Sequence, residues 1–277
     1  MASPMKNEAE IENWNGPLGE RWALFQDALD ARIRVFGEDV LGRAALREGM
    51  HVLDVGCGCG EMTAGAARAV GAKGRVVGVD ISRPMLARGR EQLKELPQLE
   101  LVEHDAATFE TDAAFEAVIS RFGLMFFDDP SAAFANIRAA TKPGGGLTFV
   151  CWQALDKNPW AAVPLSAVLR VVPPMAPSPP NAPGPFAFGD DEYLRGVLSR
   201  AGWSQVELTP VVHPVKLGDT LDEAVHYASR MGPAARAMRD ADEATVGRVV
   251  EMVRATLAPL EPSFTLDGAV WLVTARA

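Results

Sequence analysis

The sequence predicts an α/β fold built on a parallel β-sheet with helices on both faces. Short apolar, β-rich runs alternate with helical patterns along the middle of the chain, and this alternation is typical of such a sheet. The first run leads directly into a glycine-rich turn within VLDVGCGCGEM, residues 52–62, and the second run ends on an acid, Asp80. The expected strands are residues 50–56, 75–80, 99–104, 116–122 and 146–152.

Capping and stop signals mark the helices between these strands. Ser82 is expected to cap a helix with Pro84 in its first turn, and Pro97 is expected to stop it. A shorter helix is expected at 131–141, before the glycines at 144–146. These strands and helices form the predicted cofactor-binding α/β core.

Upstream of the sheet, an apolar stripe predicts one helix outside the alternating pattern. The stripe consists of Trp22, Phe25, Leu29, Ile33 and Phe36. We therefore assign residues 1–44 to an N-terminal helical cap and residues 45–152 to the core of a single domain.

The regular alternation ends after Trp152. Residues 153–189 are predicted as a proline-rich loop, because proline removes a backbone donor and fixes φ. This loop is either a surface linker or a stiff wall of a pocket. Residues 190–277 are expected to begin with a helix at 190–201 and to complete the sheet, with helices at about 220–258 that would serve as a lid.

The composition limits the class of partner. The chain has 277 residues, 48% of them hydrophobic, enough for one large core with or without a smaller lobe. Its formal net charge of −9 argues against a nucleic-acid partner and favours a small molecule. No run of roughly eighteen apolar residues predicts a membrane span. The segment MASPMKNEAE does not resemble a signal peptide, and three cysteines indicate a reducing, cytoplasmic setting.

The glycine turn indicates a nucleoside site. Gly56, Gly58 and Gly60 would let a ligand approach the backbone, although a tight turn alone is the other interpretation. Asp80 follows Gly60 by twenty residues, at the end of the second strand, where an acid accepts hydrogen bonds from ribose hydroxyls. Together these features predict the nucleoside-binding half of an α/β fold.

The charge of Asp54 favours one class of nucleoside. A carboxylate beside the turn would repel a pyrophosphate and attract a ligand with an amino or sulfonium group. The spacing GxGxG also differs from the GxGxxG of dinucleotide folds, so a nicotinamide dehydrogenase is the weaker alternative. S-adenosylmethionine, a nucleoside with both cationic groups, fits the turn.

At this point the sequence resembles the class I S-adenosylmethionine-dependent methyltransferases. Within that family it is similar to the small-molecule branch that includes the ubiquinone and menaquinone biosynthesis C-methyltransferases. The resemblance rests on five ordered stretches: VLDVGCGCG, VVGVDIS, VEHDA, AVISRFGLMFF and TKPGGGL. It covers residues 45–152 best and residues 186–212 moderately. It implies a Rossmann-like, seven-stranded mixed sheet of order 3-2-1-4-5-7-6 with the last strand antiparallel.

The resemblance also implies a set of cofactor contacts after successive strands. Asp54 would steer the amino group, Asp80 would hold the ribose and Asp105 would accept from the 6-amino group of adenine. Arg121 departs from the asparagine or serine often seen at its position. The implied cofactor-binding residues are Asp54, Gly56, Cys57, Gly58, Gly60, Asp80, Ile81, Met85, Asp105, Ala106, Ser120 and Arg121.

The expected acceptor is a small, largely apolar, aromatic or quinone-like molecule. Phe122 and Met125 would face the transferring methyl group. His226 is the candidate general base, because an imidazole has a near-neutral pKa, although positioning alone can supply much of the rate. The candidate pocket residues are Phe122, Met125, Trp152, Trp160, Met175 and His226.

Several alternatives stay open. The aromatic residues could be ordinary core. The chain could be an O- or N-methyltransferase of a specialised metabolite, or a protein that binds the cofactor without transferring methyl. The methylated atom and the oligomeric state also stay open.

The cysteines could suggest a metal or redox site. We interpret Cys57, Cys59 and Cys151 instead as small side chains, since a metal bound at C-x-C would compete with the cofactor for one space. We therefore expect no metal.

Overall fold

The computed structural model describes residues 7–112, 114–173 and 179–277, so the candidate pocket residue Met175 lies outside the described residues. The chain forms two compact units, where the sequence suggested a single domain. Unit 1 comprises Met1–Cys151, Pro183–Pro210 and Trp271–Ala277, and unit 2 comprises Trp152–Ala182 and Val211–Val270.

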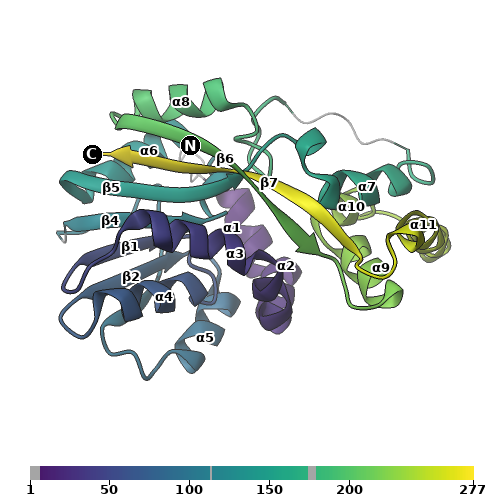
Figure 1. Cartoon of the computed structure of the whole chain (residues 1–277), viewed down its shortest axis with the longest axis horizontal. Coiled ribbons are helices and arrows are strands. Elements are labelled where there is room, and N and C mark those ends of the chain that lie inside the picture. The colour runs from purple at the N-terminus through teal and green to yellow at the C-terminus, as the bar shows by residue number, and fades with distance from the viewer. Residues whose placement is uncertain (1–6, 113, 174–178) are drawn as a thin grey trace, which may run out of the picture. The chain divides into compact units, whose positions relative to one another are not determined.

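A seven-stranded sheet runs through the chain in the order β3-β2-β1-β4-β5-β7-β6 (Figure 1). β1 is an interior strand that pairs in parallel with both β2 and β4, so that Asp54 lies opposite Gly78 on one side and Ile119 on the other. The strands are β1 (His51–Val55), β2 (Arg75–Asp80), β3 (Leu99–Glu103), β4 (Phe115–Arg121), β5 (Thr141–Trp152), β6 (Ser204–Lys216) and β7 (Thr265–Arg276).

The last strand, β7, runs antiparallel to β5. Near the start of β5, the N–H of Gly144 donates to the carbonyl of Ala277; just beyond its end, the N–H of Gln153 donates to the carbonyl of Ala269. The beginning of β5 therefore pairs with the end of β7. Both the predicted strand order and the predicted antiparallel last strand are confirmed.

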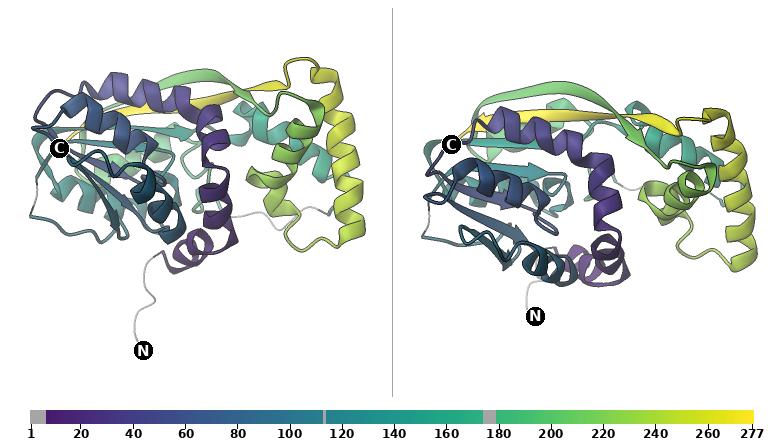
Figure 2. Two further views of the ribbon diagram at one scale, coloured as in Figure 1. Left: turned by 90° about the horizontal axis from the view of Figure 1, so that it is seen from below. Right: turned by 60° about the horizontal axis from the view of Figure 1, so that its bottom comes forward.

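Helices flank the sheet in unit 1 (Figure 2). α3 packs on β4, α4 on β2 and α5 on β3, while α6 packs against α8. Along the chain, each of the strands β1, β2 and β4 is followed by a loop that leads to the next helix. The helices of unit 1 are α1 (Glu8–Asn15), α2 (Pro17–Leu24), α3 (Gln26–Ala44), α4 (Glu61–Val70), α5 (Arg83–Gln92), α6 (Pro130–Ala139) and α8 (Asp191–Arg200).

The N-terminal helix differs from the expectation. Its apolar stripe was predicted to continue from Trp22 to Phe36, but the helix breaks at Phe25, which is 45% exposed. Only the part of the stripe within α3 is buried, including Leu29 and Phe36. Apolar residues continue at helical spacing across Phe25, so the spacing alone does not reveal the break between α2 and α3.

Unit 2 contains a helix that the sequence did not predict. The range 153–189 was expected to be loop, but α7 (Pro159–Val168) lies within it. Pro159 occupies the first turn, where proline is tolerated, and the helix also accommodates Pro164 in its interior. The closely spaced prolines begin only at Pro173. The other helices of unit 2 are α9 (Leu221–Arg230), α10 (Gly232–Ala237) and α11 (Glu243–Leu257), and α11 packs against α7 and α9.

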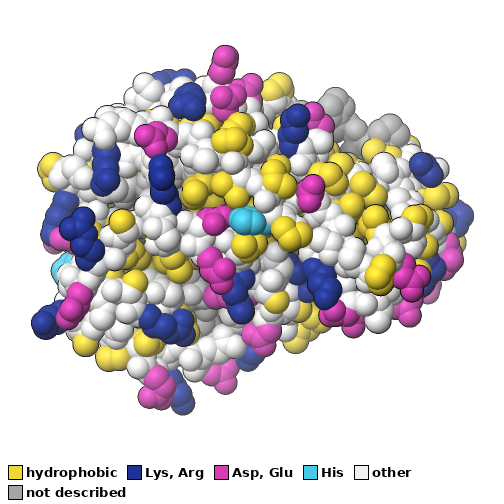
Figure 3. All heavy atoms as spheres, viewed as in Figure 1, with side chains coloured by type: hydrophobic (Ala, Val, Ile, Leu, Met, Phe, Trp, Pro, Cys, Tyr) yellow, Lys and Arg dark blue, Asp and Glu magenta, His cyan; other side chains and the backbone are white. Residues whose placement is uncertain are grey.

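The surface carries mixed charge. On the face in Figure 3, acidic and basic side chains are interspersed rather than gathered into a patch of one sign. Among the described residues, no helix is long and apolar enough to cross a membrane.

Candidate functional site

The turn after β1 requires its glycines. Gly56, Gly58 and Gly60 have φ of +69°, +58° and +86°, a region that other residues rarely adopt. A Cβ on Gly56 would lie 2.6 Å from the Cα of Gly123, and a Cβ on Gly58 would lie 2.7 Å from the Cε of Met85. Positive φ and close packing therefore both require glycine at Gly56 and Gly58.

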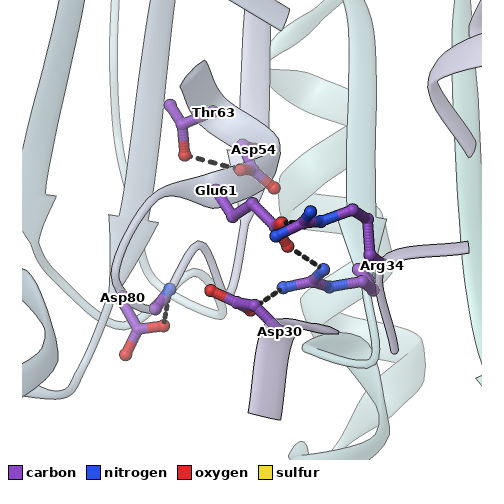
Figure 4. A network of polar contacts seen from close by, with 8 residues as sticks. Asp30, Arg34, Asp54, Glu61, Thr63 and Asp80 are labelled. Atoms are coloured by element: carbon purple, nitrogen blue, oxygen red, sulfur yellow. Dashed lines mark hydrogen bonds and ion pairs between the residues drawn. The ribbon is translucent and has the colours of Figure 1, made fainter. Parts of the chain in front are cut away.

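Asp80, the last residue of β2, is hydrogen-bonded to this turn. Its Oδ2 accepts from the N–H of Gly58 at 2.7 Å, and its Oδ1 accepts from the N–H of Ser82 at 2.8 Å (Figure 4). Burial raises the pKa of Asp80, and the backbone hydrogen bonds oppose that rise. Each carboxylate oxygen has two lone pairs, so Asp80 can still accept from ligand hydroxyls.

Asp54 is buried, and only one of its two carboxylate oxygens has a hydrogen-bond partner among the described residues. Its Oδ2 accepts from the hydroxyl of Thr63 at 2.7 Å, whereas its Oδ1 is buried and has no hydrogen-bond partner in the described part of the chain. Burial raises the pKa of Asp54 to about 6. A buried acceptor without a partner costs about 1–3 kcal/mol, and a cationic donor would remove that cost.

Arg121 takes part in an ion-pair network that joins α3, α4 and β4. Its partners Asp30 and Glu61, together with Arg34, are labelled in Figure 4. Its guanidinium contacts Asp30 at 2.6 Å and also pairs with Glu61, which pairs in turn with Arg34. Burial raises the pKa of Asp30 despite Arg121. Burial would also raise the pKa of Glu61, but Arg121 and Arg34 lower it overall. The charge of Arg121 is thus already compensated by two carboxylates.

Ser120 is likewise engaged within the fold. Its hydroxyl donates to the carbonyl of Val55 at 2.7 Å and accepts from the N–H of Gly123 at 3.3 Å. Since Ser120 is fully buried, it holds the end of β4 against the end of β1.

The loop after β3 carries Asp105. Its Oδ1 accepts from the N–H of Ala107, and its Oδ2 accepts from the side-chain amide of Asn7, both at 2.8 Å. The carbonyl of Ala106 accepts from Asn136 of α6 at 3.0 Å. Side chains of α6 and of the segment before α1 therefore fix this loop.

The remaining cofactor candidates lie beside these loops. The side chain of Met85 is buried below Gly58, and the carbonyl of Ile81 accepts from Asn15 at 2.8 Å. Sequence reasoning missed Asn7, Asn15 and Thr63. Thr63 lies in the first turn after the glycines, which is a usable signal, but nothing local marks the two asparagines.

The acceptor candidates belong to both units. In unit 1, the ring of Phe122 packs edge-on against Phe36 with centroids 5.6 Å apart, and Met125 is fully buried. In unit 2, Trp152 and Trp160 pack together with ring centroids 4.8 Å apart. These packings are compatible with the ordinary-core alternative for the aromatic residues.

His226, the candidate base, is exposed on α9, and its Nδ1 contacts the guanidinium of Arg230. Partial burial and the charge of Arg230 lower the pKa of His226. The imidazole is therefore neutral over a wider range of pH than a free histidine.

The cysteines are free, buried thiols. Cys57 packs with Leu86 and Leu101, and a Cβ on Gly78 would lie 2.9 Å from its sulfur. Burial raises the pKa of Cys57 far above its ordinary value and that of Cys59 to about 12. This packing supports their interpretation as small side chains in a crowded turn. Among the described residues, no group of three or more His, Cys, Asp or Glu could hold a metal ion.

The three acids and the glycine turn define a class of site. Asp54, Asp80 and Asp105 follow or end adjacent parallel strands, where open α/β sheets bind their ligands. This arrangement fits a nucleoside-binding α/β protein, and the buried, unpartnered oxygen of Asp54 would favour a cationic ligand.

Comparison with known proteins finds similarity to methyltransferases. Residues 52–145 match the family model described as a methyltransferase domain. The chain is 37% identical over 114 residues to a demethylmenaquinone methyltransferase of Staphylococcus aureus (strain MRSA252), an alignment that covers 40% of the chain and 47% of that relative, about half its length. It is 26% identical over 205 residues to the ubiquinone/menaquinone biosynthesis C-methyltransferase UbiE of Proteus mirabilis (strain HI4320), covering 69% and 82%.

A solved structure shares the fold. The phosphoethanolamine N-methyltransferase 2 of Haemonchus contortus, solved with S-adenosyl-L-methionine, superposes with a TM-score of 0.56 at 16% identity, covering 95% of this chain and 58% of that one. The match over residues 52–145, the sheet order and the shared fold support the resemblance to the class I S-adenosylmethionine-dependent methyltransferases.

Proposed function

We propose that the glycine turn, Asp54, Asp80 and Asp105 bind S-adenosylmethionine, and that the chain transfers its methyl group to a small, largely apolar, aromatic or quinone-like acceptor. The observation that carries the cofactor assignment is the buried, unpartnered Oδ1 of Asp54. The α-amino group of the cofactor would donate to this oxygen, directly or through water. A ligand without a donor group would leave the oxygen without a partner, and an anionic ligand would be repelled by the carboxylate.

The other cofactor residues follow from this placement. Asp80 would accept from the ribose hydroxyls, with Ile81 and Met85 beside the adenine. Asp105 would accept from the 6-amino group of adenine, and the backbone of Ala106 would contact the adjacent ring nitrogen.

Two residues change role in this proposal. The resemblance implied that Ser120 and Arg121 bind the cofactor. Their hydrogen bonds and ion pairs within the fold support a different role, which is to hold the loops around the turn in place.

The bound cofactor supplies an electrophilic methyl group on a sulfonium. The chain's own contribution is to hold the acceptor atom in line with that methyl, which lowers the barrier through orientation. Phe122 and Met125 are proposed to shape the acceptor side, and His226 is the candidate general base where the acceptor must lose a proton. The helices within 220–258 are proposed as the acceptor lid.

The relatives favour a carbon acceptor. One relative is a demethylmenaquinone methyltransferase, and the other is a ubiquinone/menaquinone biosynthesis C-methyltransferase. O- or N-methylation of another metabolite is the alternative. We also propose a cytoplasmic setting, for which the three free thiols are the support.

Two measurements test the proposal. Calorimetric titration with S-adenosylhomocysteine should show binding at a single site. Transfer from methyl-labelled cofactor to a demethylated quinol, a catechol and a primary amine should then label the quinol, and NMR of the product should place the methyl on carbon. Label on oxygen or nitrogen would support the alternative. Binding without transfer to any acceptor would indicate a cofactor-binding protein, and no binding would contradict the proposal.

A further inference from the structure

Asn7, the residue before α1, is joined to two loops that lie far from it in sequence. Its backbone N–H donates to Oδ2 of Asp128 at 2.7 Å, and its side-chain oxygen accepts from the N–H of Asp128 at 2.8 Å. Its amide nitrogen donates to Oδ2 of Asp105 at 2.8 Å. Asn7 is only 4% exposed. Both polar atoms of the Asn7 side chain are therefore hydrogen-bonded, the oxygen to the N–H of Asp128 and the nitrogen to the carboxylate of Asp105.

The backbone of Asn7 suits this arrangement. Its φ is +64°, in the left-handed region that asparagine and glycine adopt most readily. This conformation directs the side-chain amide at Asp105 while the backbone N–H remains bonded to Asp128. A second asparagine of the same segment, Asn15, donates to the carbonyl of Ile81 at 2.8 Å. The segment 7–15 therefore contacts both loops that the proposed function assigns to adenosine.

The contact fixes the orientation of the Asp105 carboxylate. Its Oδ1 is bonded to the N–H of Ala107 and its Oδ2 to Asn7, so rotation of the carboxylate would break both bonds. One lone pair on each oxygen remains available. A donor group on a ligand would be accepted there, whereas a carbonyl oxygen would be repelled.

We propose that Asn7 is a positioning residue that sets the preference of the site for a 6-amino purine by orienting Asp105. This inference rests on the proposed function, in which Asp105 meets the 6-amino group of adenine. Asn7 itself need not touch the cofactor. Its effect is to keep the acceptor face of Asp105 turned toward the purine.

The test compares two ligands that differ at that group. S-adenosylhomocysteine carries a 6-amino group and S-inosylhomocysteine carries a 6-oxo group, with the same ribose and amino acid. The measured quantity is the ratio of their dissociation constants. We expect wild type to prefer the adenosyl ligand by on the order of tenfold or more, since hydrogen bonds to charged groups are strong.

The variant is Asn7→Gly, because glycine accepts a φ of +64° and removes only the side chain. We expect the ratio to fall by at least about fivefold. Asp128→Ala removes the carboxylate that accepts from the backbone N–H of Asn7, and it should also lower the ratio. The matched control is Asn13→Ala, an exposed asparagine in α1 whose side chain bonds only to Glu10 of the same helix. It should leave the ratio unchanged.

Three outcomes would overturn the inference. They are an unchanged ratio in Asn7→Gly, a parallel loss of affinity for both ligands, and a wild-type protein that binds both ligands equally. All three leave cofactor binding and methyl transfer standing, because S-adenosylhomocysteine still binds to wild type. The third would in addition remove the proposed contact between Asp105 and the 6-amino group. Only a wild-type protein that binds neither ligand would contradict the proposed function itself.

Discussion

The hydroxyl of Thr63 donates to Oδ2 of Asp54 at 2.7 Å, while Oδ1 of the same carboxylate is buried without a partner among the described residues. One oxygen is held in place and the other is left for a ligand. Because burial raises the pKa of Asp54 to about 6, the ionised carboxylate destabilises the ligand-free protein at neutral pH. Cofactor affinity and protein stability are therefore opposed at this residue.

Asp54→Asn should stabilise the ligand-free protein near neutral pH. The folded pKa lies above the unfolded value of 3.8, so the stability associated with the protonated form is complete below about pH 4 and is lost as the pH rises through about 6. A shift of this size corresponds to about 3 kcal/mol. Urea unfolding should show the variant to be more stable by up to about that amount at about pH 7.5, with a smaller difference at about pH 4.5.

The comparison of wild type and variant isolates Asp54. Asp30 and Asp80 also have raised pKa values, but they are common to both proteins. A stability difference that stays constant between the two pH values would show that Asp54 does not titrate in this range.

Asp80→Ala should weaken S-adenosylmethionine and S-adenosylhomocysteine alike, because both carry the same ribose. Loss of two charge-assisted hydrogen bonds predicts an effect on the order of a hundredfold. Asp54→Asn should instead lower the affinity for S-adenosylmethionine, which carries a sulfonium, more than the affinity for S-adenosylhomocysteine, whose sulfur is neutral. Calorimetry with both ligands separates the two effects. Glu103→Ala, which removes an acid opposite Asp80 at the end of β3, is the control and should change neither affinity.

Gly58→Val should abolish binding of S-adenosylhomocysteine while the protein stays folded. The added side chain would meet Met85 and occupy the surface of the turn. Gly144→Val is the matched control, because Gly144 also has a positive φ, +77°, but an added Cβ there meets nothing within 4 Å. It carries the same kind of backbone strain away from the site. Near wild-type affinity in Gly58→Val would refute the assignment of the turn.

Local patterns in the sequence predicted the first five strands, the glycine turn and the acids near the strand ends, because these features lie within short stretches. The strand order and the antiparallel last strand came from the resemblance to a family. The break at Phe25 was missed because the apolar period continues through it. The partner of Arg121 was also missed, since Asp30 lies 91 residues away and only the folded chain brings the two together. The same holds for Asn7 and Asp105, which are 98 residues apart.

Arg121→Met should destabilise the protein by about 3 kcal/mol, because it leaves the largely buried Asp30 without its cation. Urea unfolding measures the loss. The control is Arg43→Met, which breaks a half-exposed pair with Glu207 and should cost no more than about 1 kcal/mol. In the double variant Asp30→Asn with Arg121→Met, part of the stability should return. Equal costs for the two arginine variants would show that the network adds nothing beyond a surface ion pair.

His226→Ala tests the proposed base. If His226 accepts a proton during transfer, the variant should lower kcat on the order of a hundredfold or more and leave the affinity for S-adenosylhomocysteine unchanged. The lowered pKa of His226 places its protonation below the ordinary value of 6.5. Wild-type kcat/KM, measured with the acceptor that takes up label, should therefore decline as the pH falls below that value, and the variant should lack this decline. His213→Ala, the other histidine of unit 2, is the control and should keep the wild-type profile. Parallel losses of turnover and cofactor affinity would make α9 a structural element, and an unchanged pH profile in His226→Ala would exclude the imidazole as the base.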